Sequence, residues 1–201
     1  VPDTKDDISQ WNAVINILTK DPDSRQAIIN IHLPGDRYSG NKDVPCTLFL
    51  QFLIRENRLN LIVGMRSNDI WLGFTNDVFQ FTMLQECMQL ELAEHIPGLQ
   101  LGHYYHNAGS MHIYDRHFEQ AKAVIADKKV IDMSMIPMDV PLYKVKDDII
   151  AIEKATETLT PEQIKELPEW IKLTPYWQLL FRACFFGDDK AFIELHGLDD
   201  H

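Results

Sequence analysis

The sequence contains few cysteines, few basic residues and no long apolar run. The cysteines are Cys46, Cys87 and Cys184. An odd number of cysteines without regular spacing argues against a disulfide framework and a zinc site. The 30 Asp and Glu residues outnumber the 19 Lys and Arg residues, so the formal net charge is −11. Because like charges repel, we expect no nucleic-acid partner. No apolar run approaches transmembrane length, so we expect no membrane partner either.

The remaining composition is ordinary for a globular protein. Of the 201 residues, 45% are hydrophobic and 24% are charged, which suits one domain, or one domain with an appended piece. The first residues, 1–7, are polar and acidic and do not resemble a signal or transit peptide. With so few cysteines, this favours a reducing, cytoplasmic location. The histidines show no metal-ligand spacing, so we expect no metal site.

The hydrophobic periodicity changes along the chain. It predicts helices over residues 8–20, 77–93 and 117–126, and strands over residues 27–33, 47–55, 59–63 and 99–105. The link Glu56-Asn57-Arg58 suits an antiparallel hairpin. Helices are also expected over residues 145–158, 176–186 and 188–195, with a further helix start at Thr160-Pro161. We therefore predict an α+β core over residues 1–129, with a mixed or antiparallel sheet flanked by helices. A mostly helical extension over residues 130–201 would pack on it.

Cys46 is the first candidate for chemistry. It follows Pro45 at the junction between a polar loop and a strand, where a thiol can be exposed and still rigidly held. Taken alone, Cys46 is better explained as a small buried residue, as most free cysteines are. Cys87 and Cys184 lie in apolar helical stretches and are expected in the core.

Two polar clusters follow Cys46 along the chain. In Arg66-Ser67-Asn68-Asp69, the Arg guanidinium could bind phosphate and stabilise a thiolate. The alternative is a charged turn in which Asp69 caps the next helix. In His112-Ile113-Tyr114, the alternation places His112 and Tyr114 on one face. Both could bind a sugar hydroxyl, or simply be satisfied partners at a buried edge.

Together these segments resemble the thymidylate synthase family, from about residue 8 to residue 126. Each motif is weak alone, and their shared order and spacing argue against chance. The matching segments are Asp21-Pro22-Asp23-Ser24-Arg25, Pro45-Cys46, Gln51-Phe52, Arg66-Ser67-Asn68-Asp69-Ile70-Trp71-Leu72-Gly73, and His112-Ile113-Tyr114 with His117.

The resemblance implies the catalytic and cofactor residues. Cys46 would attack C6 of a pyrimidine and make C5 nucleophilic. Asp69 and Gly73 would lie near the base and near 5,10-methylenetetrahydrofolate, the one-carbon donor of the family. The resemblance also implies the thymidylate synthase fold.

The resemblance also implies how a pyrimidine nucleoside monophosphate would bind. Arg66 and Ser67 would hold the 5′-phosphate. Arg25 would reach the phosphate bound by the partner subunit, because the family forms homodimers with shared active sites. His112 and Tyr114 would bind the sugar 3′-hydroxyl.

Asp77 is the departure from the family that bears most on the base. Thymidylate synthases have Asn at this position, and its amide can pair with N3–H and O4 of uracil. An ionised Asp only accepts hydrogen bonds, so it would oppose uracil O4, whereas cytosine offers an amino donor there. In this respect the sequence resembles the cytidylate hydroxymethylases. The alternative, that Asp77 caps the following helix, can hold at the same time.

The resulting hypothesis is an enzyme that transfers a one-carbon unit to C5 of a cytidine monophosphate, giving the 5-hydroxymethyl nucleotide. The substrate would be dCMP, with CMP as the alternative, and Cys46, Asp69 and Asp77 would be the catalytic residues. A thymidylate synthase acting on dUMP is the first rival. A catalytically silent nucleotide-binding or interaction module is the second, because segments of the family are missing and Met65 and Gln26 depart from the residues that the resemblance implies. The N-terminal part of the family fold is expected to be absent from this chain.

Overall fold

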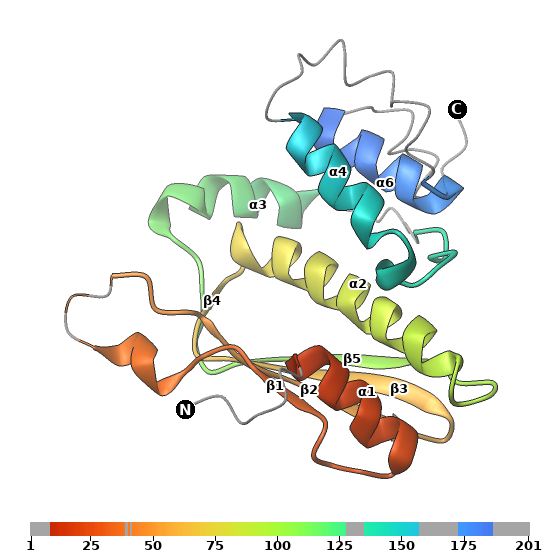
Figure 1. The fold of residues 1–201 in the computed structure, drawn as a ribbon. Coiled ribbons are helices and arrows are strands. Elements are labelled where there is room, and N and C mark those ends of the chain that lie inside the picture. The colour runs from red at the N-terminus through yellow and green to blue at the C-terminus, as the bar shows by residue number, and fades with distance from the viewer. Residues whose placement is uncertain (1–8, 39, 41, 128–134, 157–172, 187–201) are drawn as a thin grey trace. The chain divides into compact units, whose positions relative to one another are not determined.

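The computed structural model describes residues 9–38, 40, 42–127, 135–156 and 173–186 (Figure 1). The chain divides into two compact units, residues 1–128 and 129–201, which are considered separately. The first unit contains nine helices and strands within its described residues: α1 (Gln10–Lys20), β1 (Ile28–Asn30), β2 (Thr47–Arg55), β3 (Arg58–Met65), β4 (Asn68–Asp69), α2 (Gly73–Ala93), β5 (Gln100–Ala108), β6 (Met111–His112) and α3 (Phe118–Ala126). The short 3-10 helices η1 (Pro34–Arg37) and η2 (Asp115–His117) connect them.

The main sheet has four strands in the order β1-β2-β3-β5. The pairs β1–β2 and β2–β3 are antiparallel, whereas β3 and β5 are parallel and are joined through α2. β4 and β6 form a second, parallel pair. The predicted α+β fold with a mixed sheet flanked by helices is therefore confirmed.

The hairpin between β2 and β3 was predicted from its linking residues and is confirmed. Glu56 and Asn57 both adopt left-handed backbone conformations, with φ angles of 52° and 56°. Two such residues in succession form the turn whose twist matches that of paired antiparallel strands. The register Arg55↔Arg58 places this two-residue turn at the tip of the hairpin.

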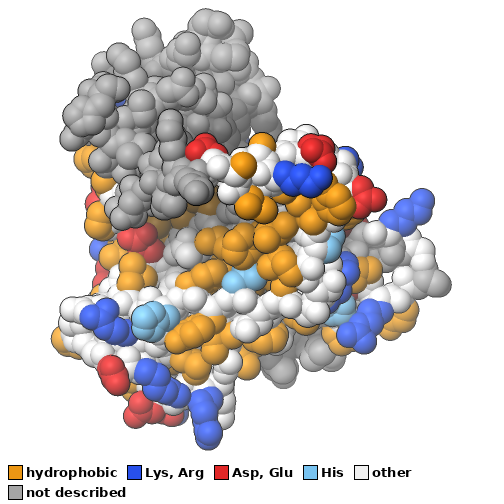
Figure 2. Space-filling view, turned by 180° about the vertical axis from the view of Figure 1, so that it is seen from behind, with side chains coloured by type: hydrophobic (Ala, Val, Ile, Leu, Met, Phe, Trp, Pro, Cys, Tyr) orange, Lys and Arg blue, Asp and Glu red, His pale blue; other side chains and the backbone are white. Residues whose placement is uncertain are grey.

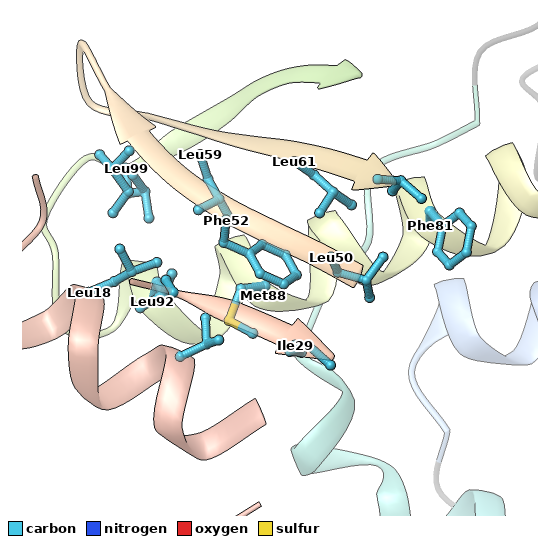
Figure 3. Packing of buried hydrophobic residues seen from close by; sticks show 14 of the residues in the cluster. Leu18, Ile29, Leu50, Phe52, Leu59, Leu61, Phe81, Met88, Leu92 and Leu99 are labelled. Carbon is cyan, nitrogen blue, oxygen red and sulfur yellow. The ribbon is translucent and has the colours of Figure 1, made fainter. Parts of the chain in front are cut away.

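The hydrophobic core lies between the sheet and the helices α1 and α2. Alternate residues of β2 and β3 are buried, including Phe52 and Leu61. Figure 3 shows these side chains pointing toward Met88 and Leu92 of α2 and toward Leu18 of α1. The period of two in the strands and of three to four in the helices thus produces one shared core.

Several element boundaries differ from the sequence predictions, including those of the first strand and the long helix. The first strand was expected over residues 27–33 but ends at Asn30, because the N–H groups of Ile31 and His32 both bind Leu48 O, at 3.0 and 3.1 Å. The long helix was expected to begin at Asp77 but begins at Gly73. Asp77 therefore lies one turn inside α2, and the interpretation of Asp77 as a helix cap was wrong.

The second unit contains α4 (Lys146–Thr156) and α6 (Pro175–Phe186), preceded by the 3-10 helix η3 (Leu142–Lys144). Asp139 joins two of its segments by accepting from the Thr174 hydroxyl at 2.6 Å and the Tyr176 N–H at 3.1 Å. The helices predicted near residues 145–158 and 176–186 are therefore present. The predicted helix start at Thr160-Pro161 and the helix over residues 188–195 lie outside the described residues. No helix in the described part of the chain is long and apolar enough to cross a membrane.

Glu91 is a buried carboxylate of α2, and the Trp11 indole N–H of α1 donates to its Oε2 at 2.9 Å. Burial raises the pKa of Glu91, the Trp11 hydrogen bond opposes this, and the charge of Glu94 raises the pKa further. The folded state therefore binds the Glu91 proton more tightly than the unfolded state does. The free energy of unfolding should fall as pH rises from the ordinary value of 4.5 through the raised pKa of Glu91.

We expect Glu91→Gln to remove this contribution, because Gln cannot ionise while its amide oxygen can still accept from Trp11. As pH rises from 4.5 toward neutrality, the free energy of unfolding of the wild type, measured in urea, should fall relative to that of the variant. Glu94→Gln removes a neighbouring charge, the smallest of the three influences on the pKa of Glu91, and should have a smaller effect. A difference between Glu91→Gln and wild type that stays constant with pH would contradict this account.

Candidate functional site

Cys46 is exposed and lies just before β2, and Arg66 lies just after β3. The antiparallel pairing of these strands brings the two residues together, and the Arg66 backbone N–H donates to Cys46 O at 2.9 Å. The Arg66 guanidinium donates to Val44 O at 2.8 Å and to Pro45 O at 3.1 Å. Arg66 is therefore fixed against the loop that carries the Cys46 thiol. A guanidinium has five N–H groups, so these two bonds leave others for an anion.

The short strands β4 and β6 bring the two polar clusters of the sequence together. The Asn68 N–H donates to Ser110 O, and the Ile70 N–H donates to His112 O, both at 2.8 Å. Asp69 is the Cα partner of His112 in this pairing. The segment that begins with Arg66 and Ser67 therefore lies beside the segment that begins with His112.

His112, Tyr114 and Arg116 form a group at the end of β6. The rings of His112 and Tyr114 meet edge to face with 5.2 Å between centroids, and the Arg116 guanidinium lies 5.0 Å from the Tyr114 ring centroid. β6 ends at His112, so the expected strand-like stretch is shorter than predicted. The two side chains are nevertheless neighbours, as a shared ligand would require.

Asp77 is linked through side chains to the far strand of the sheet. Its Oδ2 accepts from the Asn68 side-chain N–H at 3.0 Å. The same Asn68 nitrogen lies 2.9 Å from His106 Nε2 and 3.1 Å from Met65 Sδ. His106 Nδ1 in turn lies 2.6 Å from the Tyr104 hydroxyl oxygen. Side chains of α2, β4 and β5 thus form one connected polar group.

The electrostatics of this group favour neutral partners around Asp77. Burial lowers the pKa of His106, and the negative charge of Asp77 opposes that shift. Burial, and secondly the Asp77 charge, raise the pKa of Tyr104 to about 12. His106 and Tyr104 are therefore neutral near neutral pH, so a carboxylate at Asp77 is the one charge in this linked group.

Asp69 and Gly73 shape the loop that leads into α2. The two Asp69 carboxylate oxygens accept the backbone N–H groups of Trp71 and Leu72, at 3.1 and 3.2 Å. A Cβ atom on Gly73 would lie 2.8 Å from Asn68 Oδ1, so a larger residue would displace Asn68. Asp69 and Gly73 therefore support the surroundings of Asp77, and their contact with a folate stays a prediction.

Arg25 is not brought to this site by any described contact within the chain. It is exposed and precedes β1, and its carbonyl accepts from Gln51 Nε2 at 3.0 Å in the middle of β2. Its expected role in a partner subunit stays a prediction.

An apolar pocket of about 440 Å³ is formed in part by the residues between Asp69 and Asp77. Trp71 stacks on His117 there, with 5.6 Å between ring centroids. Because its surface is almost wholly apolar, the pocket suits hydrocarbon or an aromatic ring better than phosphate. Figure 2 shows hydrophobic side chains gathered in the middle of one face of the molecule, with a His side chain among them. The pocket is lined by Ile70, Trp71, Thr75, Ile113, Ala121, Val124 and Ile125.

Sequence reasoning missed three residues that contact or adjoin Asp77. Asn68 enters the sequence analysis only as part of a motif, His106 only as one of the histidines without metal-ligand spacing, and no pattern singles out Tyr104. The alternation along the predicted strand could have placed Tyr104 and His106 on one face. Their approach to Asn68 depends on the parallel pairing of β3 with β5, which no local pattern reports.

Comparison with curated proteins finds relatives in three bacteriophages. The deoxycytidylate 5-hydroxymethyltransferases of Enterobacteria phages T4, T2 and T6 are each 34% identical over 121 residues. The match covers 57% of this chain and 49% of each relative. The chain therefore spans about half the length of the curated relatives it matches.

Comparison with solved structures and with family profiles points to the same group of proteins. Thermostable thymidylate synthase A from Bacillus subtilis superposes with a TM-score of 0.56 at 27% identity, over 64% of this chain and 44% of that one. The profile of the thymidylate synthase family matches residues 2–154. The chain therefore belongs to the thymidylate synthase family.

Proposed function

We propose that this protein transfers a one-carbon unit from 5,10-methylenetetrahydrofolate to C5 of a cytidine monophosphate and releases the 5-hydroxymethyl nucleotide. The favoured substrate is dCMP, with CMP as the alternative. The names of the phage relatives support a deoxycytidylate substrate. The observation that carries the proposal is the Asp77 carboxylate, held by the Asn68 amide next to the segment of Arg66 and Ser67.

Asp77 would select the base through its acceptor oxygens. Asn68 donates to Oδ2, and within the described residues no donor contacts Oδ1. Oδ1 is therefore the acceptor offered to a ligand, and the 4-amino group of cytosine is a matching donor. Uracil has a carbonyl oxygen at that place, and two desolvated acceptors facing each other would cost about 1–3 kcal/mol or more.

Cys46 would be the nucleophile. A thiolate that adds to C6 of the pyrimidine makes C5 nucleophilic, and later expulsion of the same thiolate restores the ring. Arg66 and Ser67 would hold the 5′-phosphate and so orient C6 toward the exposed thiol. His112 and Tyr114, whose rings are neighbours, would bind the 3′-hydroxyl.

Asp69 and Gly73 would lie against 5,10-methylenetetrahydrofolate, which supplies the electrophilic carbon. Each Asp69 oxygen accepts one backbone N–H, so each retains acceptor capacity for an N–H group of a pterin. Asn68 occupies the space that a side chain on Gly73 would need, so Gly73 would contact the folate through its backbone. Once the C5 proton and tetrahydrofolate have left, addition of water to the exocyclic methylene of the nucleotide and release of the Cys46 thiolate from C6 would give the hydroxymethyl product.

The proposal includes a homodimer with shared active sites. α1 and α2 pack on one face of the sheet, and Phe49, Leu53 and Ile62 are partly exposed on the other face. Gln51 lies on that second face and binds the Arg25 carbonyl. Arg25 is thus at the edge of the face, where it could reach the phosphate bound by a second copy.

We expect Leu53→Glu to convert the dimer to a monomer, because a carboxylate would be buried without a partner at the subunit interface. Light scattering would measure the mass, and thermal melting would check that the variant stays folded. Val124→Glu, on the exposed apolar surface of α3, is the matched control and should remain dimeric. A monomeric wild-type protein, or a folded Leu53→Glu variant that is still dimeric, would rule out this interface.

Turnover of the full-length protein tests the proposed function. It would be incubated with 5,10-methylenetetrahydrofolate, oxygen-labelled water and either dCMP, CMP or dUMP. We expect 5-hydroxymethyl-dCMP that carries the label in its new hydroxyl group. Turnover confined to dUMP, with dTMP as product, would refute the proposal and identify a thymidylate synthase. Nucleotide binding without any exchange of the C5 hydrogen would identify a silent binding module.

A further inference from the structure

The polar group behind Asp77 fixes which atoms carry protons. The Asn68 side-chain nitrogen only donates, so both Asp77 Oδ2 and His106 Nε2 must accept from it. A neutral imidazole whose Nε2 accepts carries its proton on Nδ1, which then donates to the Tyr104 hydroxyl oxygen at 2.6 Å. Met65 Sδ is a third, weaker acceptor for the same Asn68 nitrogen. Each member of the group thus sets the proton position of the next.

The surroundings hold His106 in this arrangement. Phe74 of α2 meets the His106 ring edge to face, with 5.1 Å between centroids and planes at 87°. Tyr104 and His106 both lie on the partly buried side of β5. The ring is therefore confined between α2 and the sheet, and its two nitrogens face Asn68 and Tyr104.

The reverse orientation of the Asn68 amide would be incompatible with an ionised Asp77. Turning the amide would place its oxygen 3.0 Å from Asp77 Oδ2, where two acceptors would repel each other. In the observed orientation Asn68 Oδ1 is buried and has no donor among the described residues. It points toward Gly73, where a side-chain carbon would lie only 2.8 Å away. Leaving an acceptor buried and unpaired is unfavourable, so other contacts must hold the amide in place.

We propose that Tyr104 and His106 are positioning residues for Asp77: through Asn68 they hold its carboxylate in one orientation, with Oδ2 occupied and Oδ1 turned toward the base. This inference rests on the proposed function, because it makes the same carboxylate the reader of cytosine. It adds that selectivity depends on a hydroxyl and an imidazole that do not touch the base. Loss of the Tyr104 hydroxyl would leave His106 Nδ1–H without its acceptor and favour the Nε2–H tautomer. That tautomer would require Asn68 to turn its oxygen toward His106 and Asp77.

The protonation pattern can be tested without nucleotide. The ¹⁵N chemical shifts of the imidazole nitrogens distinguish the two tautomers, and the His106 signals are those lost in His106→Gln. We expect His106 to be the Nδ1–H tautomer in the wild-type protein and to shift toward Nε2–H in Tyr104→Phe. A wild-type His106 that is charged, or protonated on Nε2 at neutral pH, would overturn the inference.

Base selectivity tests the consequence. In Tyr104→Phe we expect the ratio of kcat/KM for dCMP to that for dUMP to fall about tenfold, because the turned Asn68 amide would no longer donate to the Asp77 carboxylate. Tyr105→Phe is the matched control, because Tyr105 points to the opposite side of β5, and its ratio should stay at the wild-type value. If the wild-type protein prefers dCMP and a folded Tyr104→Phe keeps the same ratio, the positioning role is wrong. A wild-type preference for dUMP would instead reject the proposed function, and the ¹⁵N result would still decide the proton pattern.

Discussion

Cys46→Ser is expected to lower the exchange of the dCMP C5 hydrogen with solvent on the order of 10⁴-fold or more, as loss of a covalent nucleophile does. At neutral pH a hydroxyl is far less ionised and less nucleophilic than a thiol, so it cannot form the bond to C6 that activates C5. The exposed position of Cys46 means that the substitution should leave folding intact. Release of tritium from C5-labelled dCMP measures the exchange directly.

Cys87→Ala is the matched control for Cys46→Ser. Cys87 is 3% exposed in α2, so its replacement should lower thermal stability while exchange per folded molecule is retained. Exchange in Cys46→Ser that remains within tenfold of wild type would show that this thiol is not the nucleophile.

Asp77→Asn is expected to lower the ratio of kcat/KM for dCMP to that for dUMP by about 100-fold or more, which moves the base preference from cytosine toward uracil. A site built for one hydrogen-bonding pattern can reject the other pattern by several orders of magnitude, because its polar groups are left unpaired. The Asn amide supplies a donor for uracil O4 that a carboxylate lacks. Competition between the two nucleotides in one reaction mixture gives the ratio without separate constants.

The double variant Asn76→Asp/Asp77→Asn keeps the net charge and moves the carboxylate by one residue along α2. It should behave like Asp77→Asn if the position of the carboxylate determines the preference. If this variant recovers the wild-type preference for dCMP, the charge of the region, rather than a hydrogen bond at residue 77, would be the cause.

Local patterns predicted the parts of the fold that local contacts stabilise. The alternation in β2 and β3 and the two-residue turn at Glu56 and Asn57 lie within 19 residues of one another, and the hairpin was predicted correctly. The start of α2 was missed, because it depends on Asp69 accepting the N–H groups of Trp71 and Leu72 before the helix begins. The end of β5 at Ala108 was also missed, because it depends on the parallel partner Met65.

In the candidate site, too, features set by local sequence were predicted and features set by distant contacts were not. The order of motifs predicted that Cys46, Arg66 and His112 belong to one site. The strand pairs β2–β3 and β4–β6 bring their segments together, and the roles of these residues stay predictions. The relation between Asp77 and His106 could not be predicted, because it runs through Asn68, which lies 38 residues before His106 in the sequence. A side-chain hydrogen bond between distant residues leaves no periodic signal in the chain.

A crystal structure of the full-length protein with dCMP tests the central claim most directly, because it shows which atoms of the base face residue 77. We expect the cytosine 4-amino group within hydrogen-bonding distance of Asp77 Oδ1, with the Cys46 sulfur facing C6. A cytosine ring whose amino group points away from Asp77, or whose C6 lies out of reach of Cys46, would contradict it.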